Sequence, residues 1–308
     1  MIRNDNFGHK VVVKSTPRIN KFVTEFLAIE AESAKDAGKL AFMARAMVMA
    51  TLPHSKPDGF IFKRKNGDYT LTIKADPQFG LPYGSLPRLL LAWLTREAKR
   101  THSPTLYLGK TFSEFLKTLN LSQSGGKRGD ATRLKDQMLR LFTSSISCIY
   151  QNNKMGMIKG DQFVVARSFE LWSSPVKQDK GKILPQSTIT LSEDFYNELV
   201  ERPIPIDLRV LNALRRSPLQ IDIYIWLTYR FSFLKCATKI PWALLKNQFG
   251  SDYGNNSMGI RDFKKQFIKS LHVVGIIYHE ANIEIRADGA ILHPSLTHIK
   301  PSKKKEEF

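Results

Sequence analysis

The order of the predicted elements constrains the fold most, because nearly the same order occurs twice along the chain. In the first half, hydrophobic periodicity predicts a helix, a short strand, a helix, a polar loop, a helix and two alternating strands, at 85–99, 105–108, 111–119, 122–129, 130–143, 147–151 and 162–169. The second half repeats this order at 219–234, 238–240, 241–249, 250–256, 257–273, 275–285 and 290–293. We therefore expect two related units with a shared element order.

This order is typical of a winged helix, in which the second helix braces the third, and the third helix and the hairpin face DNA. The predicted fold class is α+β, with two tandem winged-helix domains and an N-terminal helical extension. The predicted boundaries are an N-terminal arm with helices at 1–50, a first winged-helix domain at 51–172, a polar linker at 173–187, a second winged-helix domain at 188–298 and a charged tail at 299–308.

Two local signals add detail to the first unit. Asn66-Gly67 joins two alternating runs, at 59–64 and 69–74, and predicts a tight hairpin. Thr111 is followed three residues later by Glu114, which is the pattern of a capping box at the start of a helix. Both signals are local, so they predict structure without reference to the rest of the fold.

The net charge is the strongest indication of a partner. The chain has 47 Lys and Arg against 28 Asp and Glu, a net charge of +19. The excess is not confined to a tail, because residues 1–150 already contain 24 basic and 12 acidic side chains. Such an excess favours a polyanionic partner, usually nucleic acid or an anionic membrane surface. A protein that is merely basic is the plain alternative.

Composition and missing motifs exclude several other classes. Two distant cysteines, Cys148 and Cys236, exclude a disulfide scaffold and a cysteine-based zinc site. No apolar run approaches a membrane span, and the first residues lack the apolar core of a secretory signal. We therefore expect a cytoplasmic protein with no membrane partner, and with both cysteines packed in the interior.

No catalytic, metal or cofactor motif is present in the sequence. The stretch 125–128, Gly-Gly-Lys-Arg, resembles a phosphate loop but has Arg128 where that loop needs Ser or Thr. His-x-His, which a metal-dependent DNA-nicking enzyme would need near a nucleophilic tyrosine, is missing, as are HExxH and GxSxG. Tyr224 and Tyr229 lie in an apolar helix together with Phe231 and Phe233, so we expect core residues. The prediction is a protein that is not an enzyme and has no metal or cofactor.

The predicted helix around 260–274 is the strongest candidate for DNA contact. One arc of its helical wheel is apolar: Ile260, Phe263, Phe267, Leu271 and Val274. The opposite side carries Arg261, Lys264, Lys265, Lys269 and His272. An arginine can take guanine O6 and N7 together, so Arg261 is the candidate base contact and the lysines are candidate phosphate contacts. The alternative is the solvated face of a surface helix.

The helix at 130–143 is the corresponding candidate in the first half. Its wheel buries Leu134, Met138, Leu141 and Phe142. The opposite side carries Arg133, Asp136, Gln137 and Arg140, and Lys127 and Arg128 precede the helix. Asp136 is three or four residues from each arginine and can pair with both, which weakens the DNA interpretation. A protein contact would suit this face of mixed charge as well.

Three stretches together resemble the RepA-type plasmid replication initiators of bacteria. They are the run from Phe79 to Leu94, the segment from Leu108 to Leu121 that contains Phe112-Ser113-Glu114-Phe115-Leu116, and Gly125-Gly126 followed by Leu134 to Phe142. The resemblance extends in order over roughly residues 50–295. The central motif is the most specific part, and the C-terminal half matches mainly by pattern.

The resemblance implies a protein that binds repeated sites in double-stranded plasmid origin DNA and helps to open the origin. It implies two winged helices, of which one, usually the N-terminal one, mediates dimerisation and the C-terminal one makes the main sequence-specific contact. Implied partners are a second copy of the chain, the host initiator and the replicative helicase, and dimers often repress their own promoter. The alternatives are a plain repressor with tandem winged helices, a relaxase or recombinase, and an RNA- or membrane-surface protein supported only by charge.

Overall fold

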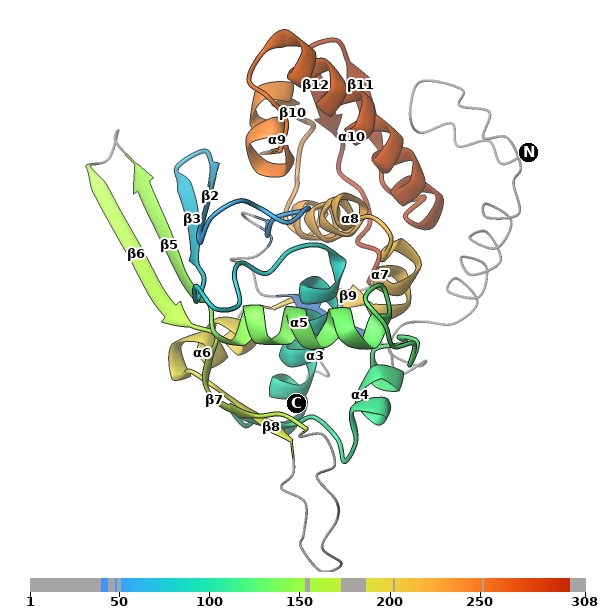
Figure 1. Cartoon of the computed structure of the whole chain (residues 1–308). Helices are drawn as coiled ribbons and strands as arrows, with labels where there is room; N and C mark the ends of the chain where they lie inside the picture. Colours follow the sequence, from blue (N-terminus) through green and yellow to red (C-terminus); the bar gives the residue numbers. More distant parts are fainter. Residues whose placement is uncertain are drawn as a thin grey trace, which may run out of the picture. The chain divides into compact units, whose positions relative to one another are not determined.

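The computed structural model describes residues 40–43, 48, 51–152, 156–172, 187–201, 203–250 and 252–299. The chain divides into two compact units, which we call the N-terminal unit (43–203) and the C-terminal unit (204–308 together with 1–42). Both combine helices with strands, in agreement with the predicted α+β class (Figure 1). Over the part of the chain that the structure describes, no helix could cross a membrane.

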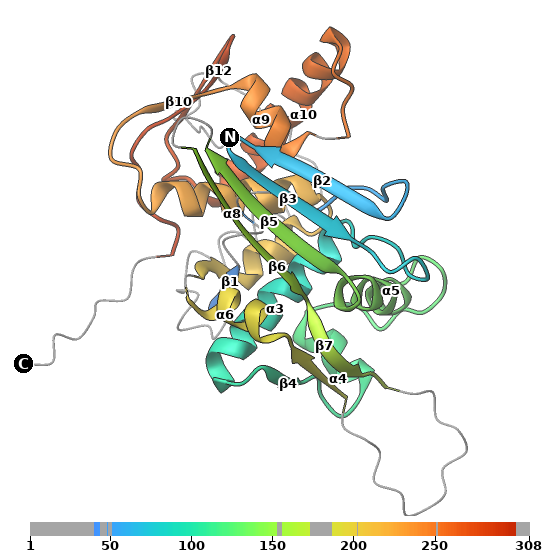
Figure 2. The same ribbon diagram turned by 90° about the vertical axis from the view of Figure 1, so that its left-hand side faces the viewer.

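The N-terminal unit contains two antiparallel sheets. The four-stranded sheet has the order β2-β3-β5-β6, and Figure 2 views it face-on; its strands are β2 (Ile61–Asn66), β3 (Tyr69–Lys74), β5 (Ser145–Asn152) and β6 (Met157–Val164). The three-stranded sheet has the order β4-β8-β7, with β4 (Thr105–Tyr107), β8 (Thr188–Leu191) and β7 (Ala166–Glu170). The helices are α3 (Ser85–Thr101), α4 (Phe112–Thr118), α5 (Asp130–Phe142) and α6 (Glu193–Glu201).

The local signals of this unit are confirmed. Asn66 pairs with Tyr69 across a tight turn in which Gly67 has φ of +59°, a conformation that glycine adopts without steric cost. At α4, the Thr111 hydroxyl accepts a hydrogen bond from the Glu114 N–H at 3.2 Å. The Glu114 carboxylate in turn accepts from the Thr111 N–H, which completes the capping box.

Strand pairing in the N-terminal unit differs from the prediction. The hairpin of β5 and β6 adds to β3, whereas β4 pairs with β8. The single strand predicted at 162–169 is divided at Val165 into the end of β6 and the start of β7, and the two parts join different sheets. Hydrophobic alternation reports that a segment is a strand but not which edge accepts it, because backbone hydrogen bonds can pair any two strands.

The boundary between the units also differs from the predicted linker at 173–187. Strand β8 lies in the middle of a sheet of the N-terminal unit, between β4 and β7, and α6 packs against α3. The division falls between Pro203 and Ile204, so the segment 188–201 belongs to the first unit and not to the second.

The C-terminal unit follows the predicted order of helices and strands from α8 onward. Its elements are β9 (Ile204–Asp207), α7 (Leu208–Leu214), α8 (Pro218–Phe231), β10 (Thr238–Pro241), α9 (Trp242–Phe249), α10 (Ser257–Ile277), β11 (Ile283–Arg286) and β12 (Gly289–Leu292). The last three strands form an antiparallel sheet of order β10-β12-β11. The helix α8 is buried over most of its length, as its apolar composition predicts.

Two predictions for the ends of this unit need correction. A strand was predicted from Gly275, but α10 continues to Ile277, and the strand β11 begins at Ile283. A helix was predicted over 17–50, but Leu40–Met43 form the strand β1, which pairs with β9. The remainder of that predicted helical segment, apart from Val48, lies outside the described residues, as does the tail at 300–308.

The core of the C-terminal unit is aromatic and is built by the predicted arc of α10. Phe263 and Phe267 are fully buried, with ring centroids 5.5 Å apart. Phe267 also lies 5.6 Å from Phe249 of α9 and meets the ring of Trp242 edge-on at 5.9 Å. Offset and edge-on aromatic contacts of this kind fix the relative position of two helices, so α9 braces α10.

Candidate nucleic-acid interface

The start of α10 is fixed by the loop that precedes it. The Asn256 side chain caps the helix by accepting from the Gly259 N–H at 2.8 Å. The ammonium of Lys246, on α9, donates to the Asn255 side-chain oxygen at 2.7 Å. A Cβ added at Gly259 would lie 2.1 Å from the Gly254 carbonyl oxygen, so the backbone approaches too closely for any other residue. The first turn of α10 is therefore held in one position.

Three predicted contact residues of α10 extend from this fixed helix into solvent. The Arg261 side chain is 75% exposed, and Lys265 and Lys269 are exposed further along the same helix. Asp262 is the one acidic residue of α10, and its carboxylate is 3.6 Å from the Arg261 Nε. An exposed ion pair of this kind contributes little, so Arg261 can exchange it for a base or a phosphate. His272 is half-buried.

Lys264 lies on the same helix but has a different role in the structure. Its ammonium donates to the Ala287 carbonyl oxygen at 2.9 Å and lies 5.4 Å from the centre of the Trp242 ring. Trp242 donates from its ring nitrogen to the Arg286 carbonyl oxygen at 3.1 Å. These bonds attach the turn between β11 and β12 to both α9 and α10.

A second set of charges lies around this turn. The Lys239 ammonium forms an ion pair with the Asp288 carboxylate, and this pair holds the pKa of Asp288 below its usual value. The exposed Arg286 guanidinium lies 2.8 Å from the Glu284 carboxylate. Sequence reasoning missed Lys239, Trp242 and Arg286 because none lies on the wheel of α10. The two-residue turn was their only signal.

The loop before α5 places two predicted cations in solvent. Lys127 and Arg128 are exposed, and Gly126 has φ of +81°. The Asp130 carboxylate accepts hydrogen bonds from the backbone and hydroxyl of Ser122, both at 3.1 Å, and so closes the loop onto the start of the helix.

The cations of α5 differ in how far they reach into solvent. The Arg133 side chain is 56% exposed and 4.0 Å from Asp130. The Arg140 side chain is only 13% exposed, and its Nε donates to the Asp136 carboxylate at 2.8 Å. Arg133 can therefore reach an external partner, whereas Arg140 lies against its own unit.

The predicted exposure of Gln137 is wrong. Gln137 is 4% exposed, and its side-chain oxygen accepts from the Tyr83 N–H at 2.8 Å. The guanidinium of Arg140 lies 5.5 Å from the centre of the Tyr83 ring and donates to the Leu81 carbonyl oxygen at 3.3 Å. Gln137 and Arg140 therefore hold the segment 79–84. The wheel missed this because it does not contain the segment that covers the helix.

These contacts explain why the motif stretches occur together in the sequence. The buried Arg88 donates to the Leu52 carbonyl at 2.8 Å and to the Gly84 carbonyl at 2.6 Å, so it fixes the other end of the same segment. A Cβ added at Gly80 would lie 2.8 Å from the Arg140 guanidinium. The stretches 79–94 and 134–142 thus form one structural assembly in the N-terminal unit.

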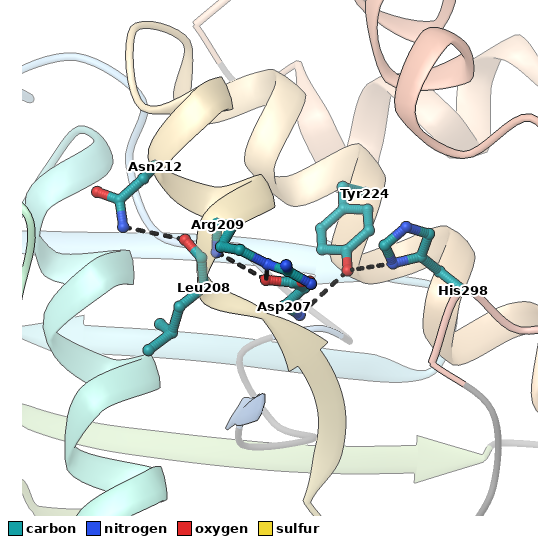
Figure 3. A network of polar contacts seen from close by, with 6 residues as sticks. All are labelled: Asp207, Leu208, Arg209, Asn212, Tyr224 and His298. Atoms are coloured by element: carbon teal, nitrogen blue, oxygen red, sulfur yellow. Dashed lines mark hydrogen bonds and ion pairs between the residues drawn. The ribbon is translucent and has the colours of Figure 1, made fainter. Parts of the chain in front are cut away.

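Tyr224, the tyrosine that a nicking reaction would need to expose, is a core residue as predicted. It is fully buried, its hydroxyl accepts from the Asp207 N–H at 3.2 Å, and the hydroxyl lies 3.0 Å from His298 Nδ1 (Figure 3). Burial raises the pKa of Tyr224 well above its usual value, which opposes its ionisation. Arg209 pairs with the buried Asp207 carboxylate at 2.7 Å and so neutralises it.

The other predicted core residues divide. Phe231 is buried, whereas Phe233 is 48% exposed and Tyr229 is half-buried. Cys148 is buried, and burial raises its pKa to about 11. Cys236 is exposed, contrary to prediction, because it follows the end of α8 rather than packing beneath it. Within the described ranges, no three His, Cys, Asp or Glu side chains are grouped so that they could hold a metal ion.

Comparisons with known proteins identify the family. The crystal structure of RctB domains 2-3 superposes with a TM-score of 0.49 and 14% identity, and covers 80% of this chain and 95% of that one. A selenomethionine form of domains 2 and 3 of RctB gives a TM-score of 0.48 and 12% identity, with 79% and 95% covered. No curated protein matches the sequence significantly. A family model described as plasmid encoded RepA protein matches residues 81–243, slightly more than half of the chain. The chain therefore belongs to the family of plasmid-encoded RepA proteins.

Proposed function

We propose that the protein initiates plasmid replication by binding repeated sites in double-stranded origin DNA, with α10 as the reading helix. The observation that carries the proposal is the fixed start of α10, with Arg261, Lys265 and Lys269 exposed on one side of the helix and Phe263 and Phe267 buried on the other. Membership in the RepA family supports a replication role. The net charge of +19 supports a nucleic-acid partner.

In this proposal, the segment from α8 to β12 acts as a winged helix. The helix α9 braces α10, and α10 enters the major groove with its N-terminal turns, where Arg261 donates to a guanine edge. Lys265 and Lys269 hold phosphates and set the register on the duplex. The turn between β11 and β12 is the wing, and its two residues make it short, so its role is to carry Arg286 beside the backbone.

The N-terminal unit has a supporting part in the proposal. Lys127, Arg128 and Arg133 are its exposed candidate DNA contacts, whereas Gln137 and Arg140 already serve the fold. Dimerisation through this unit, and recruitment of the host initiator and helicase, are proposed from the family resemblance. Action without catalysis is part of the proposal, and the buried Tyr224 supports it against a relaxase.

The test is a fluorescence anisotropy titration across a salt series, with repeat-containing origin DNA and a scrambled duplex as probes. We expect repeat-dependent binding with a steep dependence on salt. Lys265→Ala should weaken binding to both probes alike, because phosphate contacts carry no sequence information. Equal, weak binding of the two probes by the natural protein would contradict the proposal.

A transcription repressor is the second candidate, favoured by the same exposed side of α10. Both functions require site-specific binding, so a binding titration cannot separate them. An initiator must in addition open origin DNA or load helicase, which permanganate footprinting of a supercoiled origin and a helicase-loading assay measure. Binding without either activity would favour the repressor, and nicking of the supercoiled plasmid would favour a relaxase.

A further inference from the structure

The four-stranded sheet of the N-terminal unit has one buried face and one open face. Side chains alternate between the two faces of a strand, and the pairing register places the same face of each strand in rows. One face carries the buried residues Phe62, Arg64, Leu71, Ile73, Ile146, Cys148 and Phe163. The other face is exposed or half-buried along its whole length. We call it the open sheet face.

The open sheet face consists of four rows that the strand register defines. From the base outward they are Ile61, Lys74, Ser145 and Val164; Lys63, Thr72, Ser147 and Gln162; Lys65, Thr70, Ile149 and Gly160; and Gln151 and Ile158. The rows therefore present three lysines, four hydroxyl groups and two amides, with apolar side chains at the corners.

The charge of the open sheet face has one sign. None of the fourteen positions in the four rows is Asp or Glu, and Lys63, Lys65 and Lys74 are all exposed. The acidic residue of β6, Asp161, pairs with Cys148 and so lies on the other face. Asp68 lies in the turn beyond Asn66, where its carboxylate accepts from the Asn152 side chain at 3.1 Å. An anion on this face would meet no opposing carboxylate from the paired strands.

Charge argues against a second copy of the chain as the occupant. A two-fold interface brings the same patch of both copies together, so three lysines from each would meet with no carboxylate between them. Lysine is depleted at the cores of protein interfaces, because burying an unpaired ammonium is costly. Lysines interspersed with Ser, Thr and Gln are instead the donors that proteins direct at phosphate oxygens.

We propose that the open sheet face binds the phosphate backbone of nucleic acid, through Lys63, Lys65 and Lys74 with the hydroxyls of Thr70, Thr72 and Ser147 between them. This inference rests on the proposed DNA-binding function and adds a second contact surface, separate from the predicted contacts of α10 and α5. Because it contacts phosphates, the surface adds affinity and salt dependence without adding sequence preference.

The test uses the full chain with Lys63, Lys65 and Lys74 replaced together by Gln. The matched control replaces Lys110, Lys117 and Lys159, three exposed lysines of the same unit, of which Lys159 lies on the other face of the same sheet. Binding is titrated from 50 to 200 mM salt on three probes: repeat-containing duplex, scrambled duplex and a single strand. Thermal unfolding of each variant establishes that the fold is intact.

We expect the triple variant to lose about 0.9 of log-log salt slope per duplex phosphate contact, about 2.7 in all, or about 0.7 per contact on the single strand. A slope change of 2.7 corresponds to about a 40-fold smaller loss of affinity over this salt range. The ratio of affinities for repeat and scrambled duplex should not change. The single variants K63Q, K65Q and K74Q should each give about a third of the effect, so the test survives if the triple variant folds poorly.

An unchanged slope on both duplex and single strand would overturn the proposal, as would an equal change in the control variant. Loss of self-association in sedimentation experiments, with unchanged DNA binding, would overturn it in favour of a second copy as the occupant. Failure of the proposed function is distinguishable, because it removes the preference for repeat DNA in the natural protein, whereas the slope on scrambled DNA still tests the sheet face.

Discussion

The helices α5 and α10 occupy equivalent places in the predicted element order, yet their polar sides differ. On α10, Arg261, Lys265 and Lys269 extend into solvent. On α5, Arg140 and Gln137 are occupied by Asp136 and by the segment 79–84. A basic face at helical spacing is therefore not by itself an interface. It becomes one only where no other part of the chain supplies carbonyls, carboxylates and aromatic rings to its cations.

The comparison is most severely broken by a change that both helices share. Gly129 and Gly259 each lie where a Cβ would be 2.1 Å from a backbone carbonyl oxygen of the preceding loop. We expect Gly129→Ala and Gly259→Ala each to lower the free energy of unfolding by about 3 kcal/mol, at the upper end of overpacking effects. Denaturant unfolding measures this. Gly125→Ala, which meets no atom within 4 Å, is the control and should leave the midpoint unchanged.

Gln137 separates the two helices by stability. Gln137→Leu leaves the Tyr83 N–H without its acceptor, so we expect a loss of about 1–3 kcal/mol in the free energy of unfolding. We expect no change in DNA site preference. Chemical denaturation together with anisotropy on repeat DNA gives both values. Normal stability with weakened DNA binding would return Gln137 to the interface.

Arg261 should show the opposite pattern. Arg261→Ala should cost about 1–3 kcal/mol in binding to the repeat and relax preference at one base position, because a bidentate guanine contact is lost. Its unfolding curve should not move, since the side chain is 75% exposed. Arg133→Ala on α5 is the matched control and should reduce affinity for all sequences equally. An unchanged repeat preference for Arg261→Ala would end its assignment as a base contact.

Lys264 tests whether the turn must be attached to α10. Lys264→Met keeps the apolar stem and removes the bond to the Ala287 carbonyl and the contact with the Trp242 ring. We expect a loss of about 1 kcal/mol in stability, from one hydrogen bond and one partly exposed cation–π contact. Hydrogen exchange should become faster in the turn at 286–289. Unchanged exchange in that turn would mean that Trp242 and Lys239 hold it alone.

The smallest effect concerns pH and the C-terminal unit. Burial lowers the pKa of His298, although the negative charges of Asp207 and Glu280 act in the other direction and His279 and Arg209 add to the lowering. Because the unfolded chain then binds the proton more readily, stability is complete above about pH 6.5 and falls as the pH drops below it, by at most about 1.4 kcal/mol per pH unit.

Replacing His298 by Gln should remove this part of the pH dependence. The difference in melting temperature between the natural protein and His298→Gln, followed from pH 8 to pH 5, isolates it from other groups. A difference that stays constant over that range would mean that His298 is already charged in the folded protein, and that its Nδ1 does not accept from the Tyr224 hydroxyl.

The sequence by itself determined the elements whose signals are local. It predicted the positions of α3, α5, α8 and α9 within a few residues, the Asn-Gly hairpin, the capping box at Thr111 and the buried arc of α10. Each depends on residues within about one or two turns of one another, where periodicity and capping chemistry act directly. The exposure of Arg261 follows for the same reason, because it is opposite that arc.

Only the tertiary structure decided which segments meet. It paired β5 with β3 and placed β8 between β4 and β7, although alternation alone leaves every strand edge equivalent. It buried Gln137 under Tyr83 and attached Lys264 to the turn at Ala287. A polar side chain is directed by the donors and acceptors that other segments bring to it. Those segments are 23 residues away for Lys264 and 54 for Gln137, so no local pattern contains them.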